Sequence, residues 1–422
     1  MSKSRRIIGM TYEESVKYLN KTAGFAKKTS LDNVKYLLKC LGNPQDDLCF
    51  IHVAGTNGKG STCMFLETLL NEKGMRVGVF TSPHLLCVNE RIRIYGQDIG
   101  NELFAQTCSI VLHTVKKAMK EGASHPSFFE FLFLMALIAF QKEKPDYCII
   151  ETGMGGRYDV TNLIMPKLSI LTTISLDHME FLGETLSEIA FHKSGIIKKH
   201  IPVISAEQKE EARNVIYAEA VKKEAPLQIL SEDNLNFKGK YGKYIDFLNS
   251  SAYDRKRVAG KNVMGDFQGE NLALALKAAQ QLTEKYEDPV IYRALKKVRI
   301  PGRMEEVMSG VFVDVAHNIQ GIETFRKTVE AHFLRKKRIL FGASHKNEED
   351  YMREILKKIS GVELFYTVPI CGRTVDIKEF QNAFEQMIES TDKDTTCFVV
   401  GSFYLAGITK QYITRRKENV KL

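Results

Sequence analysis

Short apolar segments rich in β-branched and aromatic residues alternate with longer segments of helical period along most of this chain. The strands expected in the amino-terminal part span 50–54, 77–81, 147–150 and 168–174. The helices expected between and after them span 59–73, 102–120, 128–142, 185–198, 210–223 and 269–286, with a shorter one after 288. This alternation is typical of βαβ units, in which helices cover both faces of a mainly parallel sheet.

A second α/β series is expected after Pro301-Gly302, a pair that interrupts the helical pattern. Its strands are expected at 311–315, 338–341, 364–368 and 397–400, whereas 230–261 predicts loops and short antiparallel strands. A chain of 422 residues exceeds what one hydrophobic core usually serves. We therefore predict a first domain over 1–298, a hinge over 299–304 and a smaller second domain over 305–422.

Composition excludes several classes of protein. Hydrophobic residues make up 44% and charged residues 26%, and the net charge of +9 comes from Lys and Arg that are scattered rather than massed. The one local basic run, 335–338, leads into an expected strand. Without a recognition motif, this charge favours an anionic small substrate over a nucleic acid.

The distribution of cysteine and of apolar residues predicts a cytoplasmic protein. The 8 cysteines are spread singly, often inside apolar runs such as those of Cys148 and Cys397, as is usual for reduced thiols. The basic start, 1–6, is followed by no apolar signal segment. The most apolar stretch, 128–140, contains Glu130 and is shorter than the ~20 residues that a membrane-spanning helix needs.

A glycine-rich segment follows the first expected strand. It runs Gly55-Thr56-Asn57-Gly58-Lys59-Gly60-Ser61. Three glycines allow several backbone N–H groups to converge on phosphate oxygens at the start of a helix, and Lys59 would reach the β- and γ-phosphates. The spacing departs from the standard phosphate-loop pattern, so a plain glycine turn is the alternative interpretation. The strand–loop–helix context favours nucleotide binding.

Polar side chains follow two other expected strands at their carboxyl ends. Glu151 comes directly after 147–150, and Asp177-His178 comes after 168–174. In open α/β sheets this edge binds ligands, and a carboxylate there suits a hard cation such as Mg²⁺. Taken singly, Glu151 could instead cap the loop after it, and His178 could be a structural histidine. Their expected position at one edge favours a metal site.

The motifs together resemble one family along nearly the whole chain. They are GTNGKGS at 55–61, TSPHL at 81–85, ERIRI at 90–94, SFFE at 127–130, ETGMGGRYDVTN at 151–162, GDFQGEN at 265–271, PGRME at 301–305, DVAHN at 314–318 and GSFYL at 401–405. In this order they resemble the folylpolyglutamate synthase and dihydrofolate synthase family of the Mur ligase superfamily. The resemblance implies an α/β fold with an amino-terminal P-loop-type ATPase domain and a smaller, Rossmann-like carboxyl-terminal glutamate-ligase domain.

The resemblance also implies a set of site residues and cofactors. ATP would bind to residues 55–61, with Asn271 on the adenine, Asp314 on the ribose and Arg303 on phosphate. Two Mg²⁺ ions would be held by Ser82, Glu151 and His178, supported by Lys193 as a carbamate (N6-carboxylysine). The catalytic residues would be Lys59, His178, Lys193 and His317. From composition alone, Lys193 is a solvated helix lysine.

The implied reaction is an ATP-dependent amide ligation. ATP between the two domains would phosphorylate a folate or dihydropteroate carboxylate, and the amino group of L-glutamate would attack the acyl phosphate while domain closure excludes water. The pterin would contact Ser127, Phe128, Phe129, Glu130, Tyr158, Asp159 and Val160. Two adjacent Phe on a helix are otherwise more often core residues. The expected protein is a monomer.

Some positions depart from the family pattern. Phe267 stands where His is common, Val315 and Ile319 replace Gly and Pro, and 344–347 replaces an Asp-Lys-Asp segment. Three rival functions stay open: dihydrofolate synthase activity alone, another Mur-type amino-acid ligase, and a nucleotide-binding regulatory protein. A cell-wall ligase is disfavoured, because only about fifty residues precede the loop, fewer than a typical domain needs.

Overall fold

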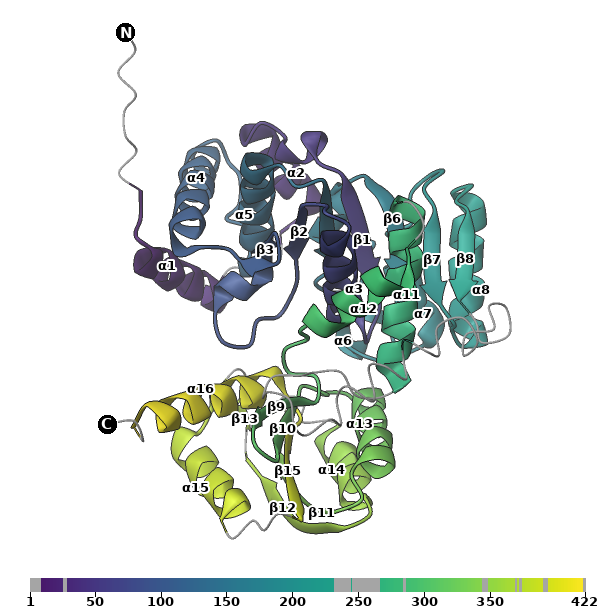
Figure 1. The fold of residues 1–422 in the computed structure, drawn as a ribbon. Helices are drawn as coiled ribbons and strands as arrows, with labels where there is room; N and C mark the ends of the chain where they lie inside the picture. The colour runs from purple at the N-terminus through teal and green to yellow at the C-terminus, as the bar shows by residue number, and fades with distance from the viewer. Residues whose placement is uncertain are drawn as a thin grey trace. The chain divides into compact units, whose positions relative to one another are not determined.

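The computed structural model describes residues 9–25, 29–230, 244, 266–283, 286–343, 348–368, 370–371, 374–389 and 394–419. The chain forms two compact units (Figure 1). Unit 1 comprises 1–82, 88–229 and 277–284, and unit 2 comprises 83–87, 230–276 and 285–422. The predicted departure at 344–347 and most of the predicted loops at 230–261 lie outside the described residues. The domain limits and the hinge stay predictions.

Unit 1 is built on a sheet of eight strands. Its strands are β1 (Phe50–Ala54), β2 (Val77–Phe80), β3 (Ile92–Ile94), β4 (Gln97–Asp98), β5 (Tyr147–Glu151), β6 (Pro166–Leu171), β7 (Val203–Ala206) and β8 (Leu227–Leu230). The order across the sheet is β4-β3-β2-β5-β1-β6-β7-β8. Strand β1 pairs in parallel with β5 and β6, while β3 and β4 are antiparallel. Strand β1 is wholly buried, as expected of a central parallel strand.

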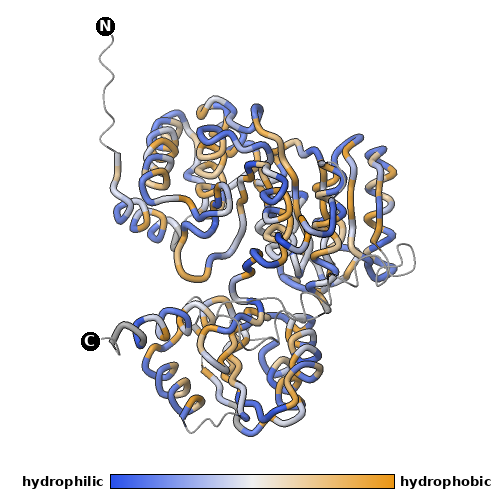
Figure 2. Tube along the Cα trace, viewed as in Figure 1, coloured by the Kyte–Doolittle hydropathy of each residue, from blue (hydrophilic) through white to orange (hydrophobic). Residues whose placement is uncertain are grey.

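Helices cover both faces of this sheet. They are α1 (Tyr12–Phe25), α2 (Leu31–Cys40), α3 (Lys59–Glu72), α4 (Asn101–Lys120), α5 (Phe128–Glu143), α6 (Met179–Leu182), α7 (Leu186–Ser194), α8 (Glu210–Lys222) and α11 (Asp266–Leu282), the last shared with unit 2. Helix α5 is buried from Glu130 to Phe140 and lies in one hydrophobic core with α1, α2 and α4. Helices α7 and α8 form a second core with β6 and β7. Figure 2 shows hydrophobic residues along the strands and mixed polarity along the outer helices.

Unit 2 has a smaller sheet of order β12-β11-β15-β10-β9. Its strands are β9 (Glu305–Met308), β10 (Val311–Asp314), β11 (Lys336–Phe341), β12 (Val362–Thr367) and β15 (Thr395–Val400), with a separate ribbon of β13 (Ile370–Cys371) and β14 (Thr374–Val375). Its helices are α12 (Asp288–Lys297), α13 (Ile319–His332), α14 (Glu349–Lys357), α15 (Ile377–Ile388) and α16 (Phe403–Asn419).

Successive residues of the strands in unit 2 contribute alternately to two hydrophobic cores, one on each face of the sheet. Phe398 packs with α13 and α14 on one face, whereas its neighbours Cys397 and Val399 pack with α15 and α16 on the other. Successive strand residues point to opposite faces, so a sheet covered on both sides is apolar at nearly every position. Val315, one of the departures from the family pattern, is buried in the second of these cores.

The α/β fold class predicted from the sequence is confirmed by the fold, with two mixed, mainly parallel sheets. The elements not predicted from the sequence are α1, α2, α6, α16, β3, β4, β7, β8, β13, β14 and the antiparallel strand β9, which precedes β10. Helix α7 is shorter than the predicted 185–198, and α11 begins earlier and ends before 286. In the described parts of the chain, no helix has the length and apolar character needed to cross a bilayer.

One buried histidine links the central strand to the loop after β5. His52 on β1 is fully buried, and its Nε2 lies 2.9 Å from the hydroxyl of Thr161. That hydroxyl donates to Asp159 Oδ1 at 2.6 Å, so it accepts from the imidazole N–H. Burial, followed by the charge of Lys198, lowers the pKa of His52 from 6.5 to about 3.

This pKa predicts acid lability. Below 6.5 the unfolded chain protonates His52 while the folded chain leaves it neutral, so stability falls as pH drops from 6.5 towards about 3. The loss approaches about 1.4 kcal/mol per pH unit in that window. The variant His52→Gln keeps a donor for Thr161 but cannot titrate. We expect its urea midpoint to fall less with acid than that of the wild type. The exposed His113→Gln serves as the control, and equal acid sensitivity of wild type and His52→Gln would contradict the assignment.

Candidate active site

The predicted site residues of unit 1 follow four neighbouring strands of the sheet, in the order β2-β5-β1-β6. Ser82 comes after β2, Glu151 ends β5, the phosphate loop (residues 55–61) follows β1, and Asp177-His178 follow β6. Because these strands are parallel, their carboxyl ends lie along one edge. The structure thus brings to one edge the polar groups that the sequence placed there separately.

The phosphate loop is fixed to the segment after β6. Thr56 N–H donates to the Thr173 carbonyl at 2.8 Å, and the Thr56 hydroxyl exchanges 3.1 Å hydrogen bonds with the backbone of Ser175. Gly55 has φ of 150°, and a Cβ there would lie 1.8 Å from Thr172 Oγ1. Only glycine fits at this position, so the close approach of loop and strand explains the first glycine of the motif.

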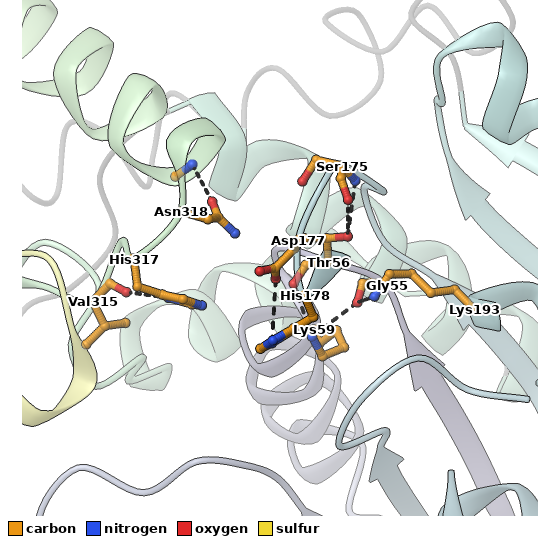
Figure 3. A network of polar contacts seen from close by, with 11 residues as sticks. Gly55, Thr56, Lys59, Ser175, Asp177, His178, Lys193, Val315, His317 and Asn318 are labelled. Carbon is orange, nitrogen blue, oxygen red and sulfur yellow. Dashed lines mark hydrogen bonds and ion pairs between the residues drawn. The ribbon is translucent and has the colours of Figure 1, made fainter. Parts of the chain in front are cut away.

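Two lysines from different helices converge on one carbonyl oxygen of the loop, as Figure 3 shows. Lys59 Nζ donates to Gly55 O at 3.1 Å and to Thr56 O at 3.0 Å. Lys193 Nζ, from the last turn of α7, donates to Gly55 O at 2.7 Å. Gly58, with φ of 88°, precedes α3, so the loop turns directly into the helix that carries Lys59.

Lys193 is not the solvated lysine that composition suggests, because it is only 3% exposed. Burial, and then the positive charge of Lys59, lowers its pKa from 10.5 to about 7, against the smaller opposing effects of Asp177 and Asp159. A large fraction of this amine is therefore neutral near pH 7, which is the form that acts as a nucleophile. From the sequence, a reactive amine at Lys193 could be expected only through the family resemblance.

Glu151 and Ser82, the predicted oxygen ligands of Mg²⁺, contact each other. The Ser82 N–H donates to Glu151 Oε2 at 2.9 Å, and a Cβ on Gly60 would lie 3.8 Å from the same oxygen. The carboxylate therefore faces the start of α3. No group of three metal-binding side chains occurs among the described residues. A Mg²⁺ ion here would take one or two protein oxygens, with phosphate and water completing its shell, as is usual for this ion.

His178 lies at the same edge in an unusual backbone conformation. Its φ of 50° puts it in the left-handed region at the start of α6, and its Nε2 is 3.9 Å from Asp177 Oδ2 (Figure 3). A non-glycine residue in this region is uncommon and is often found at functional sites. The predicted roles of His178 in metal binding and catalysis stay predictions.

The predicted pterin residues after β5 divide into buried and exposed ones. Asp159 is buried and accepts from the N–H groups of Gly153, Met154 and Thr161 as well as from the Thr161 hydroxyl. Val160 is a core residue, whereas Tyr158 is 53% exposed and contacts the ring of His192. Asp159 therefore shapes the glycine-rich loop, and Tyr158 offers the accessible ring.

The predicted pterin residues at the start of α5 form its cap. Ser127 and Glu130 make a reciprocal capping box, and Glu130 also accepts from the N–H and hydroxyl of Thr29. Phe128 carries the guanidinium of Arg91 5.1 Å above its ring, and Phe129 packs against Phe80. The segment SFFE at 127–130 is therefore a helix-capping motif as well as a family motif.

In unit 2 three predicted nucleotide residues, Arg303, Asp314 and His317, lie near the carboxyl end of β10. Asp314 is buried and accepts from the N–H groups of Met304 and Ala316, and burial raises its pKa while Arg303 opposes that rise. His317 Nδ1 donates to the Val315 carbonyl at 2.9 Å, which puts the lone pair of the neutral ring on Nε2. The Phe403 ring contacts both Arg303 and His317.

Asn271 is carried by a different element, α11. Its side chain is buried and donates to Gln268 at 3.1 Å. No role was predicted from the sequence for two other residues that shape the site, although one of them, Arg157, lies within the family motif at 151–162. Gln208, after β7, holds the segment after β6 through Ile174 N–H and Thr172 O. Arg157 binds the last turn of α7 through backbone carbonyls. Contacts to backbone carbonyls leave no residue pattern in a single sequence.

Comparison with known proteins gives one consistent answer. The Mur ligase middle domain matches residues 53–279. The dihydrofolate synthase/folylpolyglutamate synthase of Bacillus subtilis is 35% identical over 333 residues, covering 76% of this chain and 77% of that protein. The folylpolyglutamate synthase of Lacticaseibacillus casei is 28% identical over 427 residues, covering 95% and 98%. A solved FPGS–AMPPCP–folate complex superposes with a TM-score of 0.81 at 27% identity, covering 96% of this chain and all of the other.

The domain match covers more than half of the chain, and the phosphate loop, Glu151 and Lys193 all lie within it. The similarity to the two synthases extends beyond the matched domain into unit 2. The chain therefore belongs to the folylpolyglutamate synthase/dihydrofolate synthase family of Mur-type, ATP-dependent ligases.

Proposed function

We propose that this protein adds L-glutamate to a reduced folate, and also to dihydropteroate, through an acyl-phosphate intermediate. The observation that carries the proposal is the phosphate loop at the carboxyl edge of the sheet, where Lys59 and Lys193 donate to Gly55 O and the Glu151 carboxylate faces Gly60. The similarity to a synthase named for both activities supports the second acceptor. The complex with AMPPCP and folate supports ATP and folate as ligands.

The reaction divides into two steps. An oxygen of the acceptor carboxylate attacks the γ-phosphorus of ATP, the bond to the β-phosphate oxygen breaks, and ADP leaves. The amino nitrogen of glutamate then attacks the acyl carbon, a C–N bond forms, phosphate leaves and the nitrogen loses a proton. Phosphorylation thus replaces a poor leaving group with a good one before the amide forms.

The residues of unit 1 would bind and neutralise the triphosphate. Loop N–H groups at the start of α3 suit phosphate oxygens, and Lys59 would exchange two neutral carbonyl acceptors for charged ones. Ser82 and Glu151, with His178 and a carbamylated Lys193, would hold two Mg²⁺ ions. When bound, these ions would offset the negative charge of the triphosphate and of the incoming carboxylate.

The residues of unit 2 would complete nucleotide binding. Asp314 would bind the ribose, Arg303 phosphate and Asn271 the adenine. His317 would accept the proton of the glutamate amine, since its Nδ1–H is held by Val315 O and the lone pair of the neutral ring lies on Nε2. Tyr158, Phe128 and Phe129 would contact the pterin, and the segment 299–304 would act as the hinge.

The acceptor is tested by a parallel assay. Purified protein with ATP, Mg²⁺ and glutamate is given tetrahydrofolate in one reaction and dihydropteroate in another. We expect release of phosphate that requires both glutamate and the acceptor, with a product heavier by one glutamyl residue in mass spectrometry. Activity on dihydropteroate alone would favour a dihydrofolate synthase. A protein that binds ATP yet turns over neither acceptor would be a regulatory relative.

Lys59 is tested by replacement with Ala. Loss of this cation from the phosphate loop is expected to lower kcat by a factor on the order of 10² to 10³, since charge developing on the phosphates loses its stabilisation. Phosphate release measured with saturating ATP reports the change. Lys73→Ala, after the other end of α3, is the matched control. Near-normal turnover of Lys59→Ala would remove the phosphate-loop assignment.

Lys193 is tested for its modification. The neutral amine would attack the carbon of CO₂, a C–N bond would form and one proton would be released, leaving an anionic carbamate. We expect Lys193→Ala to lose activity by a factor on the order of 10², because a group bearing on the metal and phosphate charges is removed. Acetate or propionate should partly restore it. The exposed Lys199→Ala is the control. A fully active Lys193→Ala protein would exclude the role.

A further inference from the structure

The last turn of α7 is bound by one arginine from the loop after β5. The last four carbonyls of any α-helix lack partners within the helix. Arg157 supplies two of them here, because its Nε donates to Phe191 O at 3.1 Å and its backbone N–H donates to His192 O at 2.6 Å. Lys193 is the next residue in that turn, so both bonds hold the backbone that carries it.

The guanidinium of Arg157 is itself held in place from two further sides. Its Nη2 donates to Glu219 Oε2 on α8 at 2.9 Å, in a pair whose side chains are 20% and 9% exposed. Its central carbon lies 4.0 Å from the centre of the Phe191 ring, close enough for a cation–π contact. A planar guanidinium can make these contacts and the Nε bond together, whereas a lysine ammonium cannot.

Glycines bring the loop and the helix into direct backbone contact. A Cβ on Gly195 would lie 2.3 Å from Arg157 Cβ, and one on Gly156 would lie 2.9 Å from the Lys193 carbonyl oxygen. Asn162 Nδ2 bridges the two segments by donating to Arg157 O and Gly195 O. With no space at the contact, α7 cannot slide along the loop without breaking these bonds.

The consequence reaches the phosphate loop. Lys193 Nζ donates to Gly55 O at 2.7 Å from a buried position, so a shift of α7 by about 1 Å would lengthen that bond beyond the usual hydrogen-bond distance. We propose that Arg157 is a positioning residue that fixes the last turn of α7 and thereby sets Lys193 against the phosphate loop. This inference rests on the role of Lys193 in the proposed function.

The test compares four single variants. Arg157→Ala removes the side-chain contacts. Arg157→Lys keeps the positive charge but lacks the planar guanidinium, and Glu219→Gln removes only the ion pair. Arg213→Ala is the matched control, since this exposed arginine lies on α8 and its guanidinium pairs with Glu207. Melting temperatures establish that each variant is folded. The first readout is uptake of ¹³C-bicarbonate as a carbamate signal that Lys193→Ala lacks. The second is amide hydrogen exchange of the peptide 186–198.

We expect Arg157→Ala to lower carbamate occupancy at least about threefold and to speed exchange in the last turn of α7, as partner loss frays a helix end. Arg157→Lys should be intermediate, Glu219→Gln milder, and Arg213→Ala unchanged. A folded Arg157→Ala protein with wild-type occupancy overturns the inference while leaving the proposed function intact. If the wild type takes up no label, the carbamate of the proposed function fails. Exchange then decides the inference: faster exchange in Arg157→Ala supports it, and unchanged exchange overturns it.

Discussion

The close approach of the phosphate loop to the segment after β6 is the constraint on which the site depends. At Gly55 a side chain of any size would collide with Thr172, and the next two backbone N–H groups of the loop both donate to the Thr173 carbonyl. The backbone hydrogen bonds between β1 and β6 therefore continue into the phosphate loop. Because Lys59 and Lys193 both donate to Gly55 O, the position of that carbonyl also sets the positions of the two ammonium groups.

Much of the fold could be predicted because its strongest signals are local. Strands β1 and β5 are short, apolar and bounded by turns or charges, and both faces of the sheet are covered, so nearly every residue in them had to be apolar. Helices α1 and α2 were not predicted because they precede β1 and so lie outside the strand–helix alternation from which the other helices were inferred. Strands β7 and β8 have four residues each, VISA and LQIL, and a polar residue interrupts the apolar run that identified the equally short β2.

The site was predictable to the extent that topology determined it. Parallel strands put Glu151 and Asp177-His178 at one edge once the strands themselves were identified. Burial was not predictable in the same way. Lys193 occupies a helix position that composition assigns to solvent, but the loop after β5 packs over the end of α7 and the phosphate loop accepts a hydrogen bond from its amine. Arg157 and Gln208 act through backbone carbonyls, which every residue possesses, so their partners cannot be inferred from residue type.

Lys59 and Lys193 both donate to Gly55 O, a neutral carbonyl, so their ammonium groups lie close together and repel each other when both are charged. Both cannot be fully charged at low cost, since like charges in a buried site repel and desolvation disfavours each ion. The lowered pKa of Lys193, about 7, reduces this repulsion, because it leaves a large fraction of the amine neutral near pH 7. A carbamate would be a stronger response, because it replaces repulsion of Lys59 by attraction. Carbamylation would also place a negative charge beside the proposed Mg²⁺ site. One chemical change would thus end the repulsion between the two lysines and favour the binding of Mg²⁺.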